Sequence, residues 1–500
     1  MSKLEQLKDR DRGDCQSGAL DWLAELVSLQ SILLIRCNPL DREWIVEQLK
    51  MVLPKCHRWS FRVESGDIES FGFSPFKTLL EAIEPPFYGG NHLLDNYLSA
   101  LATVGLSERQ TIYEQFSNLF LLGKSYRLII LQTDDTPLPI ELSRFVREYR
   151  WAYPTTAEIG ELFDRYGLEV NDRNVRLATG LAREDLRRGI ERAILTPDPA
   201  RSLETYRNER LLLLGVKYQP TPVFKEIVGL DFLVEAVADL EFGFSAAARQ
   251  VGLPFPKGWL LAGIPGTGKT YSASAIASIL GYPMLLLEID KIKVGGIEAM
   301  ARVLEIAKMC APCIFYMDEI EKLFSLEDRP ILALLLTWLQ DKDFPVFVIG
   351  TLNRIEHLPV ETTRAGRFDR VWEISAPDDN ARVKQFLFFL SHYDPRFKDG
   401  NLVFDLYEWQ RLADETARFV GAEIQQVVIN TVLRVKKQDL EGLVSFEDLL
   451  ASAKAFRSMF KRNEKQILSI QSSIEGLADA SNSGNDSILT PRNIDVYAPV

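Results

Sequence analysis

Short apolar runs alternate along the chain with stretches in which apolar residues recur at helical spacing. In the first part, the runs from Ser31 to Cys37 and from Arg127 to Gln132 predict buried strands. Between them, the segments from Leu93 to Leu106 and from Glu108 to Leu121 predict helices. Such an alternation is typical of an α/β layer fold, and that is the fold class we expect.

A second α/β stretch begins at Glu226. Its apolar runs predict strands from Trp259 to Ala262, Met284 to Ile289, Ile314 to Met317 and Val346 to Gly350. From Asp379 onward the pattern is wholly helical, which predicts a small lid. The end of the chain, after about Ser472, is rich in Ser, Asn, Gly and Asp, so we expect a disordered tail.

An internal similarity links the two α/β stretches. The segments that begin at Leu128 and Phe347 both contain a strand, a polar turn, Leu-Pro-(Ile/Val)-Glu, an arginine-bearing turn, a short strand and a helix after a proline. The helical segments from Leu177 and Thr416 are loosely alike. Because internal similarity marks repeated modules, we infer two copies of one module. Chance similarity between two α/β units is the alternative.

Prolines on either side of a short helical stretch mark the boundary between the copies, since Pro and Gly commonly end helices and strands. We divide the chain into an N-terminal module at 1–196, a linker at 197–223, a core at 224–376, a helical lid at 377–460 and a tail at 461–500.

Composition, charge and cysteine content narrow the classes of function. Of the 500 residues, 46% are hydrophobic and 26% are charged, as in folded globular chains. A net charge of -12 disfavours DNA or RNA as a partner, which would need a basic face. No apolar run is long enough to predict a transmembrane segment, and the N-terminal stretch lacks the apolar region of a secretory signal.

The five cysteines are too few and scattered for a disulfide framework, which indicates a reducing, cytoplasmic compartment. Cys310 and Cys313 have the spacing of a redox pair. Their position directly before an apolar strand favours two buried thiols instead.

The segment GIPGTGKT, from Gly263 to Thr270, matches the P-loop pattern and lies between a predicted strand and a predicted helix. Backbone N–H groups of such a turn converge on phosphate, the lysine contacts the β- and γ-phosphates, and the Thr hydroxyl coordinates Mg²⁺. A glycine-rich turn with an incidental lysine is the alternative. The expected ATP-binding residues are Gly263, Pro265, Gly266, Thr267, Gly268, Lys269, Thr270 and Tyr271.

Two carboxylates, Asp318 and Glu319, directly follow the apolar strand that begins at Cys313. Ligands of open α/β sheets bind at the carboxyl ends of strands. Behind a P-loop we therefore expect Asp318 to hold Mg²⁺ and Glu319 to orient and deprotonate the attacking water. Taken alone, such a run is usually a strand that meets solvent.

Three further polar residues are candidates for the same chemistry. Asn353 follows the strand that ends at Gly350 and is placed to sense the γ-phosphate or the water; an ordinary turn asparagine is the alternative. Arg364 and Arg367 lie three residues apart in a turn, where they can reach the γ-phosphate of a neighbouring subunit. Surface arginines bonded to a local carboxylate such as Asp369 are the alternative.

These motifs resemble those of the AAA ATPases over about Phe224 to Phe456. GIPGTGKT, FYMDEI, GTLN and TRAGRFD occur in the family's order. The resemblance implies nucleotide contacts from Val228, in the opening FKEIVGLD, and from Gly421, in the second-sensor region. APCIFYMDEIEK and LTWLQ are also similar to the AAA proteins of cyanobacteria and algal chloroplasts encoded by hypothetical chloroplast reading frame forty-six.

The resemblance implies a P-loop NTPase core of the AAA+ class, with a parallel sheet flanked by helices, a C-terminal helical lid and a degenerate AAA-like α/β module in front. It also implies a homo-oligomeric ring such as a hexamer, a protein partner, and a location in the cytoplasm, or in the plastid stroma for a chloroplast-encoded chain.

Two departures limit what carries over. Lys293 stands where polypeptide-threading relatives have a pore-loop aromatic, and only Ser325 to Pro330 separate Phe324 from the next helix, so a long glycine-rich loop is missing. The N-terminal copy has Asn38-Pro-Leu-Asp41 in place of a P-loop. We expect that copy to lack ATPase activity, with Arg144 and Arg147 in structural roles.

The leading hypothesis is a Mg-dependent ATPase that remodels or regulates a protein partner. The alternatives are a slow nucleotide-dependent binding switch that recruits a partner through the N-terminal module, and a silent subunit that supplies arginines to another chain.

Overall fold

The computed structural model describes residues 32–53, 56–60, 90–121, 126–133, 136–151, 153–222, 231–354, 358–474 and 478–480. The chain forms two compact units, Met1–Arg210 and Leu211–Val500. Most of the stretch expected as a linker, 197–223, is regular structure: helix α10 (Pro199–Leu213) and strand β6 (Val216–Gln219). Pro199 is the first residue of α10, where a helix tolerates proline because that N–H has no partner inside the helix.

The first unit contains a five-stranded parallel sheet in the order β2-β3-β4-β1-β5. Its strands are β1 (Ile32–Arg36), β2 (Cys56–Ser60), β3 (Gly90–Asp95), β4 (Tyr126–Gln132) and β5 (Arg147–Arg150). The two strands expected in this part of the chain are confirmed as β1 and β4. The helix expected from Leu93 is wrong at its start, because Leu93 to Asp95 belong to β3. Leu93 and Leu94 pack into different apolar clusters on the two faces of the sheet. Because both faces of the strand are buried, its apolar residues do not alternate with polar ones, and the pattern cannot distinguish a strand from a helix.

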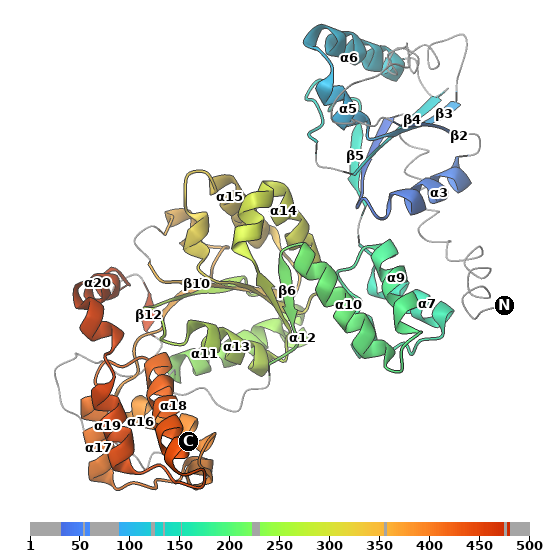
Figure 1. The fold of residues 1–500 in the computed structure, drawn as a ribbon. Coiled ribbons are helices and arrows are strands. Elements are labelled where there is room, and N and C mark those ends of the chain that lie inside the picture. Colours follow the sequence, from blue (N-terminus) through green and yellow to red (C-terminus); the bar gives the residue numbers. More distant parts are fainter. Residues whose placement is uncertain are drawn as a thin grey trace. The chain divides into compact units, whose positions relative to one another are not determined.

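Helices cover both faces of this sheet (Figure 1). Helices α5 (Tyr97–Thr103) and α6 (Leu106–Leu121) lie on one face, and α3 (Arg42–Val52) lies on the other. A separate helical cluster follows, with Phe163, Leu186 and Ile190 in its core. It consists of α7 (Thr156–Tyr166), α8 (Asp172–Arg176), α9 (Arg183–Ala193) and α10.

The second unit is built on a seven-stranded sheet in the order β12-β11-β7-β10-β9-β8-β6. Every pairing is parallel except that of β6 with β8. The strands after β6 are β7 (Gly258–Ala262), β8 (Met284–Leu287), β9 (Cys313–Met317), β10 (Val346–Leu352), β11 (Arg370–Glu373) and β12 (Asp479–Ala480). Helices α11 (Asp231–Phe244) and α13 (Lys269–Leu280) cover one face, and α14 (Ile289–Met309) and α15 (Arg329–Asp341) cover the other (Figure 1). A short helix, α12 (Ala246–Gln250), follows α11.

The two sheets share one strand order. If the first five parallel strands of each unit are numbered in chain order, leaving out β12 at the edge of the second sheet, both sheets have the order fifth, first, fourth, third, second: β5-β1-β4-β3-β2 and β11-β7-β10-β9-β8. This shared order supports the inference, made from sequence, that the first unit repeats the module of the second.

A helical lid follows the second sheet. It contains α16 (Asp379–Ser391), η3 (Pro395–Gly400), α17 (Leu406–Glu415), α18 (Gly421–Gln438) and α19 (Phe446–Ala455). Trp409, fully buried, lies in its apolar core with Phe386 and Phe419. The lid therefore has a hydrophobic core of its own.

The expectation that residues 461–500 form a tail outside the folded unit, disordered after about Ser472, is wrong for its first part. Helix α20 (Met459–Ile474), which bends at Asn463, continues through this segment, and β12 adds to the sheet beside β11. Ile467, Ile470 and Ile474 are buried on one side of α20, a spacing that the polar average composition concealed. Residues 481–500 lie outside the described residues.

The described part of the chain holds no helix long and apolar enough to cross a membrane. In that same part no disulfide forms, and Cys310 and Cys313 are buried thiols. Burial raises the pKa of the Cys313 thiol well above its ordinary value, which opposes the thiolate a redox pair needs.

Candidate functional site

A cavity of about 630 Å³ lies between the second sheet and the lid. It opens at the carboxyl ends of β7, β9 and β10, where parallel α/β sheets bind ligands. From the sheet side it is lined by Pro265, Gly266, Thr267, Gly268, Lys269, Thr270, Tyr271, Ser272, Asp318, Glu319 and Asn353. The structure thus brings nearly all the residues expected from the P-loop and from the two following strand ends to one cavity.

The glycine turn between β7 and α13 has a backbone that side chains would not permit. Gly266 has φ 85° and Gly268 has φ 101°, both in the left-handed region. A Cβ on Gly266 would also lie 2.9 Å from Val420 Cγ2, at the start of lid helix α18. The Ala422 N–H donates to the Gly266 carbonyl at 3.3 Å, so the turn and the lid are in direct contact.

Lys269 is the first residue of α13, and its side chain is buried. Its ammonium donates to the carbonyl oxygens of Gly263 and Ile264 at 2.8 and 3.1 Å. Burial lowers the pKa of Lys269 to about 8, opposed by nearby carboxylates, of which Glu321 is the first. The carbonyl groups of the turn therefore hold the Lys269 ammonium close to the N-terminus of α13.

Asp318 and Thr270 are joined by Tyr316, which lies outside the predicted set of site residues. The Tyr316 hydroxyl lies 3.0 Å from Thr270 Oγ1 and 3.0 Å from Asp318 Oδ1. Thr351, also missed, donates from Oγ1 to Asp318 Oδ1 at 2.6 Å and accepts the Glu319 N–H at 2.9 Å. The signal was present: a tyrosine in an otherwise apolar strand, two positions before the aspartate, faces the same side of the strand as that carboxylate.

Glu319 has φ 53°, an uncommon conformation for a residue other than glycine. Its two oxygens have different partners: Oε1 accepts from Asn353 Nδ2 at 3.0 Å, and Oε2 pairs with Lys322 Nζ at 3.0 Å. Lys322 belongs to η1 (Ile320–Leu323). The Asn353 N–H donates to Glu321 Oε1 at 2.9 Å, and burial raises the pKa of Glu321. Asn353 therefore contacts Glu319 and is itself held in place by Glu321.

The lid side of the cavity is largely aromatic. Phe388, Phe389, His392 and Tyr393 line it from α16 and its end, and Gly421 lines it from α18. The Phe388 and His392 rings pack edge to face at 4.8 Å. Apart from Gly421 these residues were not expected, because the aromatic run in α16 also fits a helix that packs into a core.

The arginine turn lies apart from the cavity of its own chain. Neither Arg364 nor Arg367 lines that cavity, and Arg364 is exposed. Arg367 donates to the carbonyl of Glu361, which lies in η2 (Val360–Thr363). Asp369 Oδ2 accepts the N–H groups of Lys257 and Gly258 at 2.7 and 3.1 Å. Its carboxylate thus anchors backbone, not the neighbouring arginines.

Two other expected features fall elsewhere. Val228 lies outside the described residues. Lys293, within α14, pairs with Asp328 at 2.8 Å, and the next residue, Val294, is 92% exposed. The Lys293 ammonium is therefore paired with a carboxylate of its own chain, and the exposed side chain next to it is that of Val294.

The donor set suits a magnesium nucleotide. Thr270 and Asp318 offer a hydroxyl and a carboxylate, the hard oxygen ligands that Mg²⁺ prefers, and Mg²⁺ usually takes its other ligands from phosphates and water. Within the described ranges, no group of three or more His, Cys, Asp or Glu residues is arranged to hold a metal by itself. A divalent ion at this site would depend on the phosphates of a nucleotide, and Lys269 and the glycine turn would bind those phosphates.

Comparison with known proteins identifies a family. Residues 259–376 match the family described as ATPase family associated with various cellular activities (AAA). The chain is 31% identical to the AAA domain-containing protein ycf46 of Guillardia theta, over 69% of this chain and 73% of that protein. It is 31% identical to the proteasome-activating nucleotidase of Methanococcus vannielii, over 44% of this chain and 57% of that protein. Among solved structures, the FIGL-1 AAA domain in complex with ADP is 19% identical, covering 54% of this chain and 97% of that one, with a TM-score of 0.45.

Proposed function

This chain belongs to the AAA family of ATPases, in the group of the algal ycf46 proteins, and from that premise we propose that it binds Mg-ATP in the described cavity and hydrolyses it. One observation carries the proposal: the glycine turn, Lys269, the Thr270–Asp318 pair and Glu319 all face the same cavity. Each supplies a different requirement of phosphoryl transfer.

The chain's own residues divide the work as follows. The N–H groups of the turn and the start of α13 bind the phosphates, and the Lys269 ammonium moves from the Gly263 and Ile264 carbonyls to the β- and γ-phosphates. Thr270 and Asp318 would hold Mg²⁺, with Tyr316 fixing their separation. When bound, the metal neutralises charge that develops on the phosphate oxygens.

Glu319 is the group placed to take a proton from the attacking water. Its carboxylate stands at the cavity wall, oriented by Asn353 at 3.0 Å. Accepting a proton requires an oxygen directed at the water, so we infer that Oε2 leaves Lys322 when nucleotide and water are bound. Arg364 and Arg367 do not line this cavity, and we assign them to the site of a neighbouring copy in a ring.

Hydrolysis would be coupled to movement of the lid. The Ala422–Gly266 hydrogen bond joins the lid to the turn that holds the phosphates. ATP can shift the lid only if it binds one arrangement more tightly than the other. A remodelling activity on a protein partner would use that difference.

A second candidate is a slow nucleotide-dependent switch, and Lys293 favours it. The residue stands where threading relatives carry an aromatic, and its ammonium is engaged by Asp328 at 2.8 Å. Turnover that is slow and unaffected by added unfolded polypeptide would support the switch, whereas strong stimulation would support remodelling.

The test of the proposed site is nucleotide binding by Lys269→Ala. Because charge-assisted hydrogen bonds contribute about 1.5–3 kcal/mol, we expect affinity for a fluorescent ATP analogue with Mg²⁺ to fall roughly 10- to 100-fold. Lys437→Ala, an exposed lysine in α18, is the matched control and should bind as the parent does. Equal affinity of parent and Lys269→Ala would place the nucleotide elsewhere.

A further inference from the structure

The edge of the first sheet corresponds to the ATP-site edge of the second, residue by residue. In the first unit Arg36 is paired in register with Gln132, and the Cys37 N–H donates to the Gln132 carbonyl at 3.0 Å. In the second unit Ala262 is paired with Leu352, and the Gly263 N–H donates to the Leu352 carbonyl at 3.1 Å. Cys37 therefore occupies the position of Gly263, the first residue of the P-loop.

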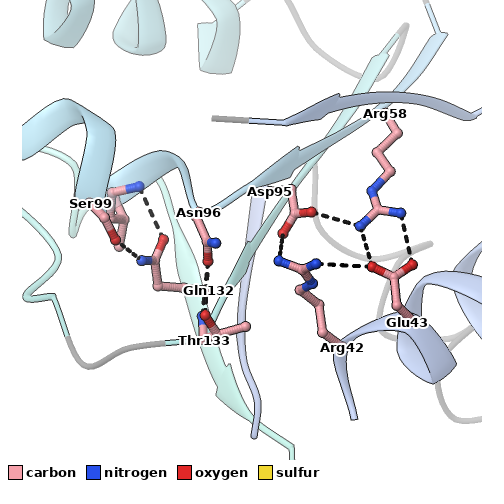
Figure 2. A network of polar contacts seen from close by, with 9 residues as sticks. Arg42, Glu43, Arg58, Asp95, Asn96, Ser99, Gln132 and Thr133 are labelled. Carbon is pink, nitrogen blue, oxygen red and sulfur yellow. Dashed lines mark hydrogen bonds and ion pairs between the residues drawn. The ribbon is translucent and has the colours of Figure 1, made fainter. Parts of the chain in front are cut away.

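The third parallel strand of each unit ends in a similar way. Asp95 is the last residue of β3 and Asn96 follows it, and Asp318 and Glu319 come directly after β9. The second residue of each pair is left-handed, with φ 56° at Asn96 and 53° at Glu319. Thr133 Oγ1 donates to Asn96 Oδ1 at 3.0 Å, as Asn353 Nδ2 donates to Glu319 Oε1 at 3.0 Å (Figure 2). The first unit thus retains the backbone of the catalytic edge, with an amide in place of the proposed catalytic carboxylate.

The helix after the first strand also corresponds. Arg42 and Glu43 open α3 in the positions that Lys269 and Thr270 take in α13. The connecting turn contains no glycine, and Asp41, 3% exposed, accepts the Glu184 N–H at 3.0 Å. Asp41 caps the backbone of α9 through this hydrogen bond, so its carboxylate stays at the turn. A phosphate bound there would lie beside that carboxylate.

A guanidinium lies where the second unit would hold its metal. Arg58 Nη2 is 2.7 Å from Asp95 Oδ2 and 2.8 Å from Glu43 Oε1, and Arg58 Nη1 is 2.9 Å from Glu43 Oε2 (Figure 2). Arg42 lies beside the pair, 3.1 Å from Glu43 and 3.8 Å from Asp95. Asp95 is 1% exposed, so its charge needs a partner inside the protein. Hydrogen bonds from Arg58 lower the pKa of Glu43 to about 2, which keeps this second carboxylate charged.

We propose that Arg58 is a built-in replacement for the divalent cation of the first unit, bridging Glu43 and Asp95 as Mg²⁺ would bridge Thr270 and Asp318 in the second. The carboxylates of the first unit are then paired without a nucleotide or a metal ion. That unit keeps one state through the ATP cycle, and the chain binds a single nucleotide, in the second unit. The first unit then does not respond to nucleotide, whereas the second unit does.

The direct test removes the guanidinium in the full chain. In Arg58→Ala, Asp95 and Glu43 lose the nearer of their two shared cations, and of the described cations Asp95 keeps only Arg42, at 3.8 Å. We therefore expect backbone amides of β3 to exchange hydrogen roughly 10- to 100-fold faster than in the parent. Addition of MnCl₂ should slow that exchange again, because the two carboxylates then face an open cation position. Exchange in the double variant Arg58→Ala/Asp95→Asn should not respond to MnCl₂. Arg144→Ala, an exposed arginine of the same unit, is the control and should match the parent.

Three outcomes would overturn the proposal. The first is a hydrogen-exchange rate of β3 in Arg58→Ala within about twofold of the parent's, where the expected effect is at least tenfold. The second is exchange in Arg58→Ala that MnCl₂ does not slow. The third is protection of β3 by Mg-ATP in Lys269→Ala. Lys269→Ala weakens nucleotide binding by the second unit, so protection of β3 at an unchanged ATP concentration would point to nucleotide bound in the first unit, and failure there is separable from failure of the ATPase assignment. Should Arg58→Ala not fold, Arg58→Lys retains a cation and should restore folding, whereas Arg58→Met should not.

Discussion

Tyr316 offers a sharp test of the metal site, because one hydroxyl touches both proposed ligands. Tyr316→Phe deletes only that oxygen from a side chain that is 3% exposed, and leaves the ring packing in place. The lost contacts are the two at 3.0 Å, to Thr270 Oγ1 and Asp318 Oδ1. A hydrogen bond to a charged group contributes about 1.5–3 kcal/mol. Asp318 Oδ1 keeps the Thr351 hydroxyl at 2.6 Å, so we take the lower end of this range, about 1.5 kcal/mol, which is roughly tenfold.

The expected result is a roughly tenfold higher magnesium concentration for half-maximal ATPase activity, in line with the effect of groups that orient metal ligands. Most of the turnover should return at high magnesium, and binding of ATP in EDTA should be unchanged. Tyr282→Phe, a half-buried tyrosine whose ring packs against Phe244, is the matched control. A magnesium dependence equal to that of the parent would refute the idea that Tyr316 positions the metal ligands.

Three further predictions concern ATP binding, the pH dependence of stability, and the core of the lid. Gly266→Ala should weaken ATP binding in a fluorescence titration, because φ 85° and a Cβ 2.9 Å from Val420 add roughly 1–3 kcal/mol of strain. Burial lowers the pKa of Lys342 to about 7 from 10.5, so the folded chain binds fewer protons than the unfolded chain between these values. Stability should rise with pH in that window, by at most about 1.4 kcal/mol per unit, and Lys342→Met should flatten the rise in urea unfolding at pH 7 and 9. Trp409→Ala should destabilise the lid by about 3–5 kcal/mol, seen as faster hydrogen exchange in α18.

Much of the second unit follows from its sequence, because its signals are local. A P-loop pattern fixes a strand, a turn and a helix together, and a strand that ends in two carboxylates fixes where these point. The expected strands were found as β7, β8, β9 and β10. What the pattern could not supply was the set of contacts between segments far apart in the chain, such as Tyr316 with Thr270 and Ala422 with Gly266.

The first unit shows where local signals fail. The pattern predicts the start of a helix where β3 lies, because both faces of that strand are buried, and it gives no sign of β2, since Cys56 to Ser60 has a polar composition. Arg58 lies in that strand. Its role depends on Asp95, 37 residues away, and no spacing rule connects the two. The repeated module could be inferred from sequence, but the replacement of a metal by a guanidinium could not.

The chain's chemistry is tested most directly by ATP turnover in Glu319→Gln, measured beside ATP binding in the same preparation. The substitution keeps the shape and the Asn353 contact but removes the group that accepts the proton of water. We expect ATP affinity close to that of the parent and turnover roughly 100- to 10,000-fold slower. Hydrolysis by Glu319→Gln at the parental rate would contradict the assignment of Glu319 and, with it, the proposed mechanism.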